Sequence, residues 1–290
     1  MSTQLQPSAN VAFEFVRTLA SELSAGKVDL PSFPEIAVRV RRILSDPKSS
    51  IDQVVRVVGS EPALAARLMR ISNSASLNRS GRPIAELRTA INRIGYNMVR
   101  SAAISFAMAQ IRNANKLSGL EHYLSDLWRR STLVAAYSYV LARTCSHVNP
   151  DEAMLGGMMH GIGKLYVLTR ATSHPELFAD RAMLDSIIND WHASIAKAIL
   201  ENWEFSEEMA SAIGEQDVQE SDETAAEPSL RDVIVVAIVM ASFSTEPSGL
   251  GEALQNLQSA LRLGLDPEKT RMVMEECAAE IAALNNALGA

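Results

Sequence analysis

Apolar residues recur at helical spacing through the first third of the chain, without the apolar–polar alternation of a half-buried strand. Leu64, Leu68 and Ile71, for example, stand at positions i, i+4 and i+7. Such segments begin near prolines such as Pro34 and stop near glycines such as Gly95. Short amphipathic helices have to bury their apolar faces against one another, so we expect an all-α fold.

The rest of the chain follows the same pattern with longer helices. We expect helices over 128–143, 151–160 and 183–202, and a strongly apolar one over 230–244. Aromatic residues make up only 5% of the chain, and a composition rich in Ala, Leu, Ile, Val and Met favours helices. The sequence predicts two helical subdomains plus C-terminal helices, in this order: an N-terminal helix or extension (1–27), a first helical subdomain (28–115), a second one (116–215), an acidic linker (216–229) and C-terminal helices (230–290).

Residues 215–229 differ from the helical segments around them. They contain six acidic residues, no basic ones and almost nothing to bury, so we expect a mobile linker. The helix expected over 230–244 is so apolar that other protein must cover it. Two interpretations remain open for that helix: it belongs to the core of this chain, or it forms an oligomer or partner surface shielded by the acidic segment.

Cysteine usage and the N-terminus indicate a reducing, aqueous compartment. Cys145 and Cys277 lie far apart without a CxxC motif, so no disulfide framework is expected. The N-terminus, MSTQLQPSAN, has neither the basic nor the apolar region of a signal peptide. The longest apolar run, 233–241, is far shorter than the roughly 20 residues that span a bilayer. We therefore expect a cytoplasmic protein without a membrane partner.

The net charge of −7 conceals an asymmetry along the chain. Residues 31–112 contain 13 Lys and Arg against 5 Asp and Glu, whereas residues 113–290 contain 12 against 26. Either the two parts dock on each other or carry solvated faces, or the basic part binds an anionic partner: an acidic protein, a nucleotide or a nucleic acid. Most of the basic residues are Arg, which suits bidentate contacts to carboxylates or phosphates.

Five stretches of the sequence resemble the HDOD domain family. They are LPSFPEIAVRVRRIL, SEPALAARLMRISNSAS and IAELRTAINRIGYNMVR in the first subdomain, and LWRRSTLVAAYSYVLA and MLGGMMHGIGKL in the second. The similarity extends over roughly residues 28–215. It implies an all-α fold whose second half is related to the HD phosphohydrolases. In those enzymes, histidines and an adjacent aspartate hold one or two metals that activate water against a phosphate ester.

The resemblance also implies where the metal ligands of such an enzyme would lie in this sequence. The first histidine is replaced by Arg130, which is always protonated and cannot be a ligand. The adjacent His-Asp pair becomes His160 and Gly161, so one imidazole is kept and the carboxylate is lost. A later histidine is kept as His192.

The terminal His-His pair of many relatives corresponds to a segment that holds Glu215 and Gln216. Glu215 offers an oxygen ligand, but at the edge of the expected mobile linker. A hydrolytic metal centre needs several ligands that converge from different helices. The retained set therefore predicts neither metal nor cofactor, and no hydrolytic activity.

Other interpretations remain open for the residues around the former metal site. His160 is a packed or hydrogen-bonded cap of its helix, where a partly charged ring would suit the helix dipole, or else it contacts an anion or a residual metal. Arg130 forms an internal ion pair or faces an anion. Together with Lys164 and His192, these residues form a candidate small-ligand pocket.

The resemblance implies a role in bacterial signal transduction through binding of other signalling proteins. We expect a non-catalytic adaptor for a kinase, a response regulator or a cyclic-dinucleotide protein, with a contact surface formed by Arg67, Arg70, Asn73, Arg79 and Arg82. The alternative is a divergent metal-dependent phosphohydrolase acting on a nucleotide or cyclic dinucleotide. Nucleic-acid binding is disfavoured because the basic part has few aromatic residues for stacking and no identifiable recognition helix. A homodimer is compatible with the sequence.

Overall fold

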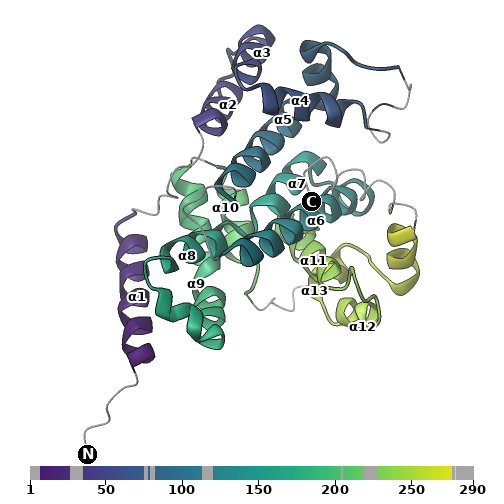
Figure 1. The fold of residues 1–290 in the computed structure, drawn as a ribbon. Coiled ribbons are helices and arrows are strands. Elements are labelled where there is room, and N and C mark those ends of the chain that lie inside the picture. Colours follow the sequence, from purple (N-terminus) through teal and green to yellow (C-terminus); the bar gives the residue numbers. More distant parts are fainter. Residues whose placement is uncertain are drawn as a thin grey trace, which may run out of the picture.

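The structure, a computed structural model, describes residues 7–26, 35–74, 78, 82–112, 120–203, 205–218, 227–275 and 278. Every regular element within these ranges is a helix, which confirms the all-α prediction. The elements are α1 (Pro7–Ser24), α2 (Glu35–Ser45), α3 (Ile51–Gly59), α4 (Pro62–Ser72), α5 (Leu87–Arg112), α6 (Glu121–Cys145), α7 (Pro150–Met159), α8 (Ile162–Ala171), the short 3₁₀ helix η2 (Pro175–Ala179), α9 (Arg181–Asn202), α10 (Glu207–Gly214), α11 (Leu230–Ser242), α12 (Leu250–Gln255) and α13 (Gln258–Arg262). Figure 1 shows α2–α4 at the top of the molecule, α6–α8 and α11 near its centre, α1 at the lower left and α12 and α13 at the lower right.

The helices of the first subdomain, α2–α5, begin and end at local signals. The Ser50 hydroxyl accepts a hydrogen bond from the Gln53 amide (3.3 Å), and the Gln53 side chain accepts one from the Ser50 amide (2.7 Å). This capping box starts α3 where the sequence predicts it. Within α5, Gly95 adopts φ +77° and ψ 164°, a conformation that strongly favours glycine. The helix is therefore kinked at Gly95, between the stripe over 87–94 and the longer arm that follows.

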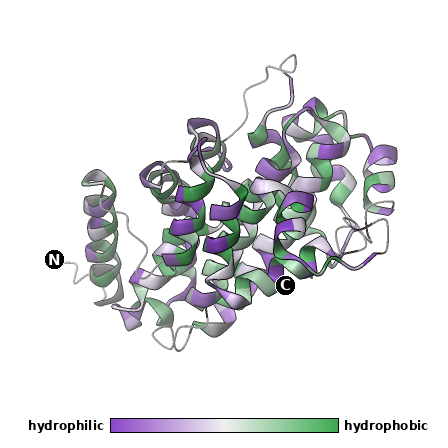
Figure 2. Ribbon diagram, turned by 90° about the horizontal axis from the view of Figure 1, so that it is seen from above, coloured by the Kyte–Doolittle hydropathy of each residue, from purple (hydrophilic) through white to green (hydrophobic). Residues whose placement is uncertain are grey.

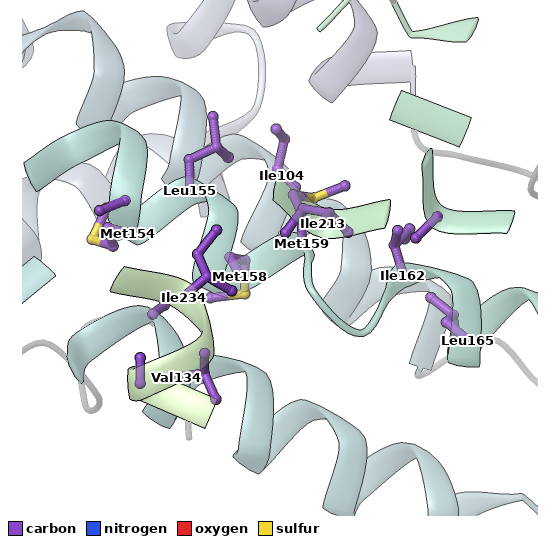
Figure 3. Close-up of a cluster of buried hydrophobic side chains, with 14 of the residues drawn as sticks. Ile104, Val134, Met154, Leu155, Met158, Met159, Ile162, Leu165, Ile213 and Ile234 are labelled. Carbon is purple, nitrogen blue, oxygen red and sulfur yellow. The ribbon is translucent and has the colours of Figure 1, made fainter. Parts of the chain in front are cut away.

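The second subdomain, α6–α10, contributes many of the buried hydrophobic residues of the core. Figure 3 shows side chains from four of its helices, including Met158, Ile162 and Ile213, gathered in one buried cluster. Helices α6 and α7 approach very closely, since a Cβ on Gly157 would lie only 2.7 Å from the Cα of Ala135. This close packing fixes the end of α7, where the candidate site begins.

Helix α11 belongs to the same core. Its residue Ile234 lies in the buried cluster of Figure 3, and Val233 and Val236 are fully buried. The helix packs against α6, α7 and α10. This burial decides the open question about the apolar segment 230–244, because the rest of this chain covers the helix.

Helix α1 docks on the outside of the second subdomain, on α9 and η2. It buries Phe15 and Leu19, and its Glu22 carboxylate accepts a hydrogen bond from the Tyr166 hydroxyl of α8. The same carboxylate forms an ion pair of 2.9 Å with Arg170. The N-terminal helix is thus attached to the helix that follows His160 in the sequence.

Hydrophobic and hydrophilic residues lie on different sides of most helices, as Figure 2 shows by colour. Amphipathic helices of this kind bury their apolar stripes against each other. Within the part of the chain that the structure describes, no helix is both long and apolar enough to cross a membrane.

Candidate functional site

His160 lies in the turn between α7 and α8. Helix α7 starts at Asn149, whose side chain accepts hydrogen bonds from the amides of Asp151 and Glu152, and it ends at His160. The His160 ring is buried, and its Nδ1 lies 2.7 Å from the Gly157 carbonyl oxygen, to which it donates. The interpretation of His160 as a buried, hydrogen-bonded helix cap therefore agrees with its geometry.

The protonation state of the His160 ring differs from the one expected from the sequence. Burial lowers the pKa of His160 to about 3, and the neighbouring Lys164 and Arg130 also disfavour a charged ring, while the bond to Gly157 opposes these effects. The ring is therefore neutral at physiological pH. This corrects the suggestion that a partly charged imidazole interacts with the dipole of α7.

Gly161, at the start of α8, stands where the resemblance implies an aspartate in the metal-binding relatives. A Cβ on Gly161 would lie 2.7 Å from Leu127 Cδ1 and 3.1 Å from Ser131 Oγ, both on α6. An aspartate side chain here would have to displace Leu127. The space next to His160 that a carboxylate would need is thus already filled by the neighbouring helix.

His192, on α9, forms a pair that the sequence does not predict. Its Nε2 lies 2.9 Å from Asp217 Oδ2, and the side chains are 4% and 56% exposed, respectively. This hydrogen bond holds the pKa of Asp217 below its usual range, although burial opposes the shift. The other ring nitrogen of His192, Nδ1, is buried and has no partner among the described residues.

The segment predicted to be a mobile linker begins with an ordered turn. Gln216 is buried and its Nε2 donates a hydrogen bond of 3.0 Å to the His160 carbonyl oxygen. Arg231 of α11 donates to the carbonyl oxygens of Glu215 (2.9 Å) and Val218 (2.6 Å). Residues 215–218 are therefore attached to both α11 and the turn at His160, contrary to the prediction for this part of the linker. Residues 219–226 lie outside the described residues.

The Gln216 amide and Glu215 have different surroundings in this turn. Gln216 reaches the backbone of His160 with its amide, which is an interaction between neutral groups. The Glu215 side chain is exposed to solvent. Neither residue joins the two imidazoles in a set of metal ligands.

Arg130 faces the C-terminus of α11. Its Nη2 donates to Ser242 Oγ (2.8 Å) and, at 3.5 Å, to the Ile238 carbonyl oxygen. Burial lowers the pKa of Arg130, which nevertheless remains cationic because a guanidinium does not deprotonate in proteins. Among the described residues no carboxylate pairs with Arg130, so the expectation of an internal ion pair is wrong. Instead, the cation interacts with the negative end of the α11 dipole.

Lys164 is the second cation beside His160. It lies half-buried in the first turn of α8. Burial lowers the pKa of Lys164, the nearby Asp217 and Asp185 oppose that shift, and Arg130 adds to it. The four residues of the predicted pocket therefore lie close enough to influence one another electrostatically. Their balance is positive because Arg130 and Lys164 are cations and His160 is neutral.

This set of residues does not fit a divalent metal. Structural and catalytic metal sites use three or more ligands from Cys, His, Asp and Glu. Within the described ranges, no group of three or more such residues is placed to hold a metal ion. Two cations, Arg130 and Lys164, would in addition repel a metal next to His160.

Two of the residues predicted for a partner surface have structural roles. Arg67 is only 7% exposed and donates a hydrogen bond of 2.8 Å from Nη2 to Ser105 Oγ, so its prediction as a surface contact is wrong. The Asn73 side chain donates to the carbonyl oxygens of Met69 and Ile84 and accepts from the Ile84 amide. Asn73 thus holds the backbone of a loop while remaining exposed.

The structure describes two of the other three residues predicted for the partner surface. Arg70 and Arg82 are exposed, as a contact surface requires. Arg79 lies outside the described residues. Of the arginines predicted for this surface, Arg70 and Arg82 are thus the ones that the structure shows to be exposed.

The described chain is an all-helical protein in which His160 lies in the turn between α7 and α8. Residues 30–218 match the family described as the HDOD domain. The chain belongs to the HDOD domain family, which confirms the resemblance seen in its sequence motifs.

Three relatives show how widely this fold is shared. A solved structure from Shewanella amazonensis SB2B, provisionally named a metal-dependent phosphohydrolase, is 26% identical, with a TM-score of 0.77 over 96% of this chain and 99% of that one. A structure from Marinobacter aquaeolei VT8, provisionally named a signal transduction protein, is 18% identical, with a TM-score of 0.61 over 100% of this chain and 68% of that one. An uncharacterized protein of Treponema pallidum (strain Nichols) is 22% identical over 212 residues, which are 67% of this chain. The match covers only 39% of that relative's own length.

Proposed function

We propose that this protein is a non-catalytic regulatory module of bacterial signal transduction that acts by binding another signalling protein. The partner would be a kinase, a response regulator or a cyclic-dinucleotide protein. The observation that carries this proposal is the replacement of the metal ligands by packing and hydrogen bonds. Arg130 binds the end of α11, Leu127 fills the space beside Gly161, and Gln216 binds the His160 backbone.

The names of the two solved relatives point to different functions. The Shewanella protein is provisionally named a phosphohydrolase and the Marinobacter protein a signal transduction protein. The residues of this chain favour a role in signal transduction over hydrolysis. A hydrolase needs a metal or an equivalent electrophile, together with an activated water, whereas a binding module needs only a stable scaffold.

The rival function, hydrolysis of a nucleotide or cyclic dinucleotide, has one observation in its favour. The imidazoles of His160 and His192 are both retained, and each donates a ring N–H to an oxygen, as metal-binding histidines commonly do. Two imidazoles leave the ligand set incomplete. We therefore give priority to the binding function.

A turnover assay separates the two functions. We expect the purified protein with added Mn²⁺ to hydrolyse neither cyclic di-GMP nor bis(p-nitrophenyl) phosphate faster than Mn²⁺ in buffer does. The control is the double variant His160→Gln/His192→Gln, which should give the same background rate. Hydrolysis by the wild-type chain that disappears in the double variant would refute the proposal and support the phosphohydrolase.

A further inference from the structure

A basic groove lies in the first subdomain, away from the turn at His160. It is a pocket of about 710 Å³, within the ~300–1,000 Å³ range of typical ligand sites. The groove runs along the extended segment 82–86 and the first turns of α5. Its lining residues are Arg82, Pro83, Ile84, Ala85, Glu86, Thr89 and Arg93.

Two asparagines hold this groove in shape. The Asn73 side chain binds both the amide and the carbonyl group of Ile84. The buried Asn78 side chain donates to the Arg82 carbonyl oxygen (2.7 Å) and accepts from Arg93 Nη1 (3.3 Å). Asn78 therefore connects the backbone of one arginine with the guanidinium of the other. Such preorganisation lowers the entropic cost of binding.

The charges of the groove favour an anionic partner. Arg82 and Arg93 are both exposed, and Arg70 is exposed on the last turn of α4, just before Asn73. The one carboxylate in the lining, Glu86, accepts a hydrogen bond of 3.1 Å from Thr89 Oγ1. The groove also lies within residues 31–112, where basic residues outnumber acidic ones by 13 to 5.

We propose that this groove binds an acidic segment, rich in Asp and Glu, of the partner protein. Arg82 and Arg93 pair with its carboxylates, since a guanidinium matches a carboxylate with two parallel hydrogen bonds. Asn73 and Asn78 are positioning residues. The inference rests on the proposed function, because it names the chemistry of the surface that the partner presents.

A nucleic acid fits the groove less well than an acidic peptide. Phosphates repeat along a strand and need a continuous basic track, often with aromatic residues on which bases stack. Here Glu86 lies between the two arginines in the sequence, and none of the described residues that line the groove is aromatic. An oligonucleotide is nevertheless included in the test.

Fluorescence anisotropy with a short labelled Asp/Glu-rich peptide tests the groove, with a Gly/Ser peptide of equal length as the neutral probe. We expect saturable binding of the acidic peptide only, weakened about tenfold or more in both Arg82→Glu and Arg93→Glu, because each change removes a charge-assisted pair and adds a repulsion. The Arg82 substitution leaves intact the backbone carbonyl that Asn78 uses. Thermal unfolding of each variant, with Arg82→Gln as a milder change, separates lost binding from lost folding.

The matched control is Arg56→Glu, an exposed residue of α3 outside the groove, which makes the same change in net charge. Its affinity should stay within about twofold of wild type at physiological salt, where distant charges are screened. Equal losses in all three variants, or no saturable binding of the acidic peptide, would overturn the proposal. Tighter binding of a labelled DNA oligonucleotide with the same dependence on Arg82 would overturn it in favour of nucleic acid. If the peptide fails while the turnover assay remains negative, only the groove is wrong and the non-catalytic function stands.

Discussion

Replacing Asp232 by Asn should lower the free energy of unfolding by about 3–5 kcal/mol, because it breaks a buried ion pair. Asp232 lies in the first turn of α11, and its side chain is 4% exposed, as against 8% for its partner Arg262. One carboxylate oxygen accepts hydrogen bonds from Arg262 Nε (2.9 Å), Arg262 Nη2 (2.6 Å) and Ser259 Oγ (2.7 Å). The other accepts from the Ser229 amide (2.8 Å) and hydroxyl (2.7 Å).

An asparagine cannot replace this carboxylate. It lacks the charge that balances Arg262, and its NH₂ group would face donors on one side of the site. The network joins α11 to α13, so its loss should loosen the C-terminal helices from the core. Chemical denaturation of both proteins measures the difference in the free energy of unfolding.

The effect should depend on pH in a defined direction. Burial alone would raise the pKa of Asp232, but the hydrogen bonds from Arg262, Ser229 and Ser259 outweigh it, so the pKa lies below its ordinary value. The stabilisation is therefore complete above the unfolded-state pKa of about 3.9 and is lost as the pH falls through the lower folded-state pKa. The difference between wild type and Asp232→Asn should accordingly be largest near neutral pH and shrink in strong acid.

The matched control is Glu275→Gln, which makes the same acid-to-amide change in an exposed ion pair. Glu275 lies 2.8 Å from Arg271, with both side chains more than 60% exposed. Exposed pairs of this kind contribute about 0–1 kcal/mol, so this variant should unfold almost like wild type. If Asp232→Asn were no more destabilising than Glu275→Gln, the described network would not hold the C-terminal helices.

Replacing Gly163 by Ala should destabilise the protein by about 3 kcal/mol or more, the upper end of what overpacking costs in a filled core. A Cβ on Gly163 would lie 1.8 Å from the backbone oxygen of His192 and 2.7 Å from its carbonyl carbon. Both are main-chain atoms, so no side-chain rotation can relieve the clash. Helices α8 and α9 would have to separate.

Gly251→Ala is the matched control for Gly163→Ala. Gly251 lies in helix α12, and a Cβ there would meet nothing within 4 Å. Because alanine is the better helix former by roughly 0.5–1 kcal/mol, this variant should be as stable as wild type or slightly more so. Equal stabilities of Gly163→Ala and wild type in urea denaturation would contradict the close contact between α8 and α9.

Helix starts, and the need of the apolar segment 230–244 for protein cover, were predictable from the sequence because their causes are local. Ser50 and Gln53 are three residues apart, so a capping box is visible in the sequence itself. The apolar character of 230–244 requires cover whatever the fold, and the structure supplies it from α6 and α7. The family motifs predicted the fold in the same way, since they fix the order of the helices.

The site itself depends on contacts that no local pattern encodes. Asp217 lies in an acidic stretch whose composition predicts a mobile linker. Residues 215–218 are nevertheless held in place by His192 of α9, which binds Asp217, and by Arg231 of α11, which binds the backbone. Arg67 has the charge of a surface residue and is nevertheless buried against Ser105, 38 positions along the chain. An adjacent carboxylate and amide after α10 were the only sequence signal for the Asp217 and Gln216 contacts, and such a pair is common in loops.

Metal binding by His160 and His192 would distinguish a retained metal centre from a site without one. The wild-type protein and His160→Gln/His192→Gln are dialysed against Mn²⁺, Ni²⁺ or Zn²⁺, and the bound metal is measured by elemental analysis. Since Arg130, Gly161 and Gln216 stand where the resemblance implies metal ligands, we expect the same substoichiometric metal content for both proteins. One tightly bound ion per wild-type chain, absent from the double variant, would contradict it.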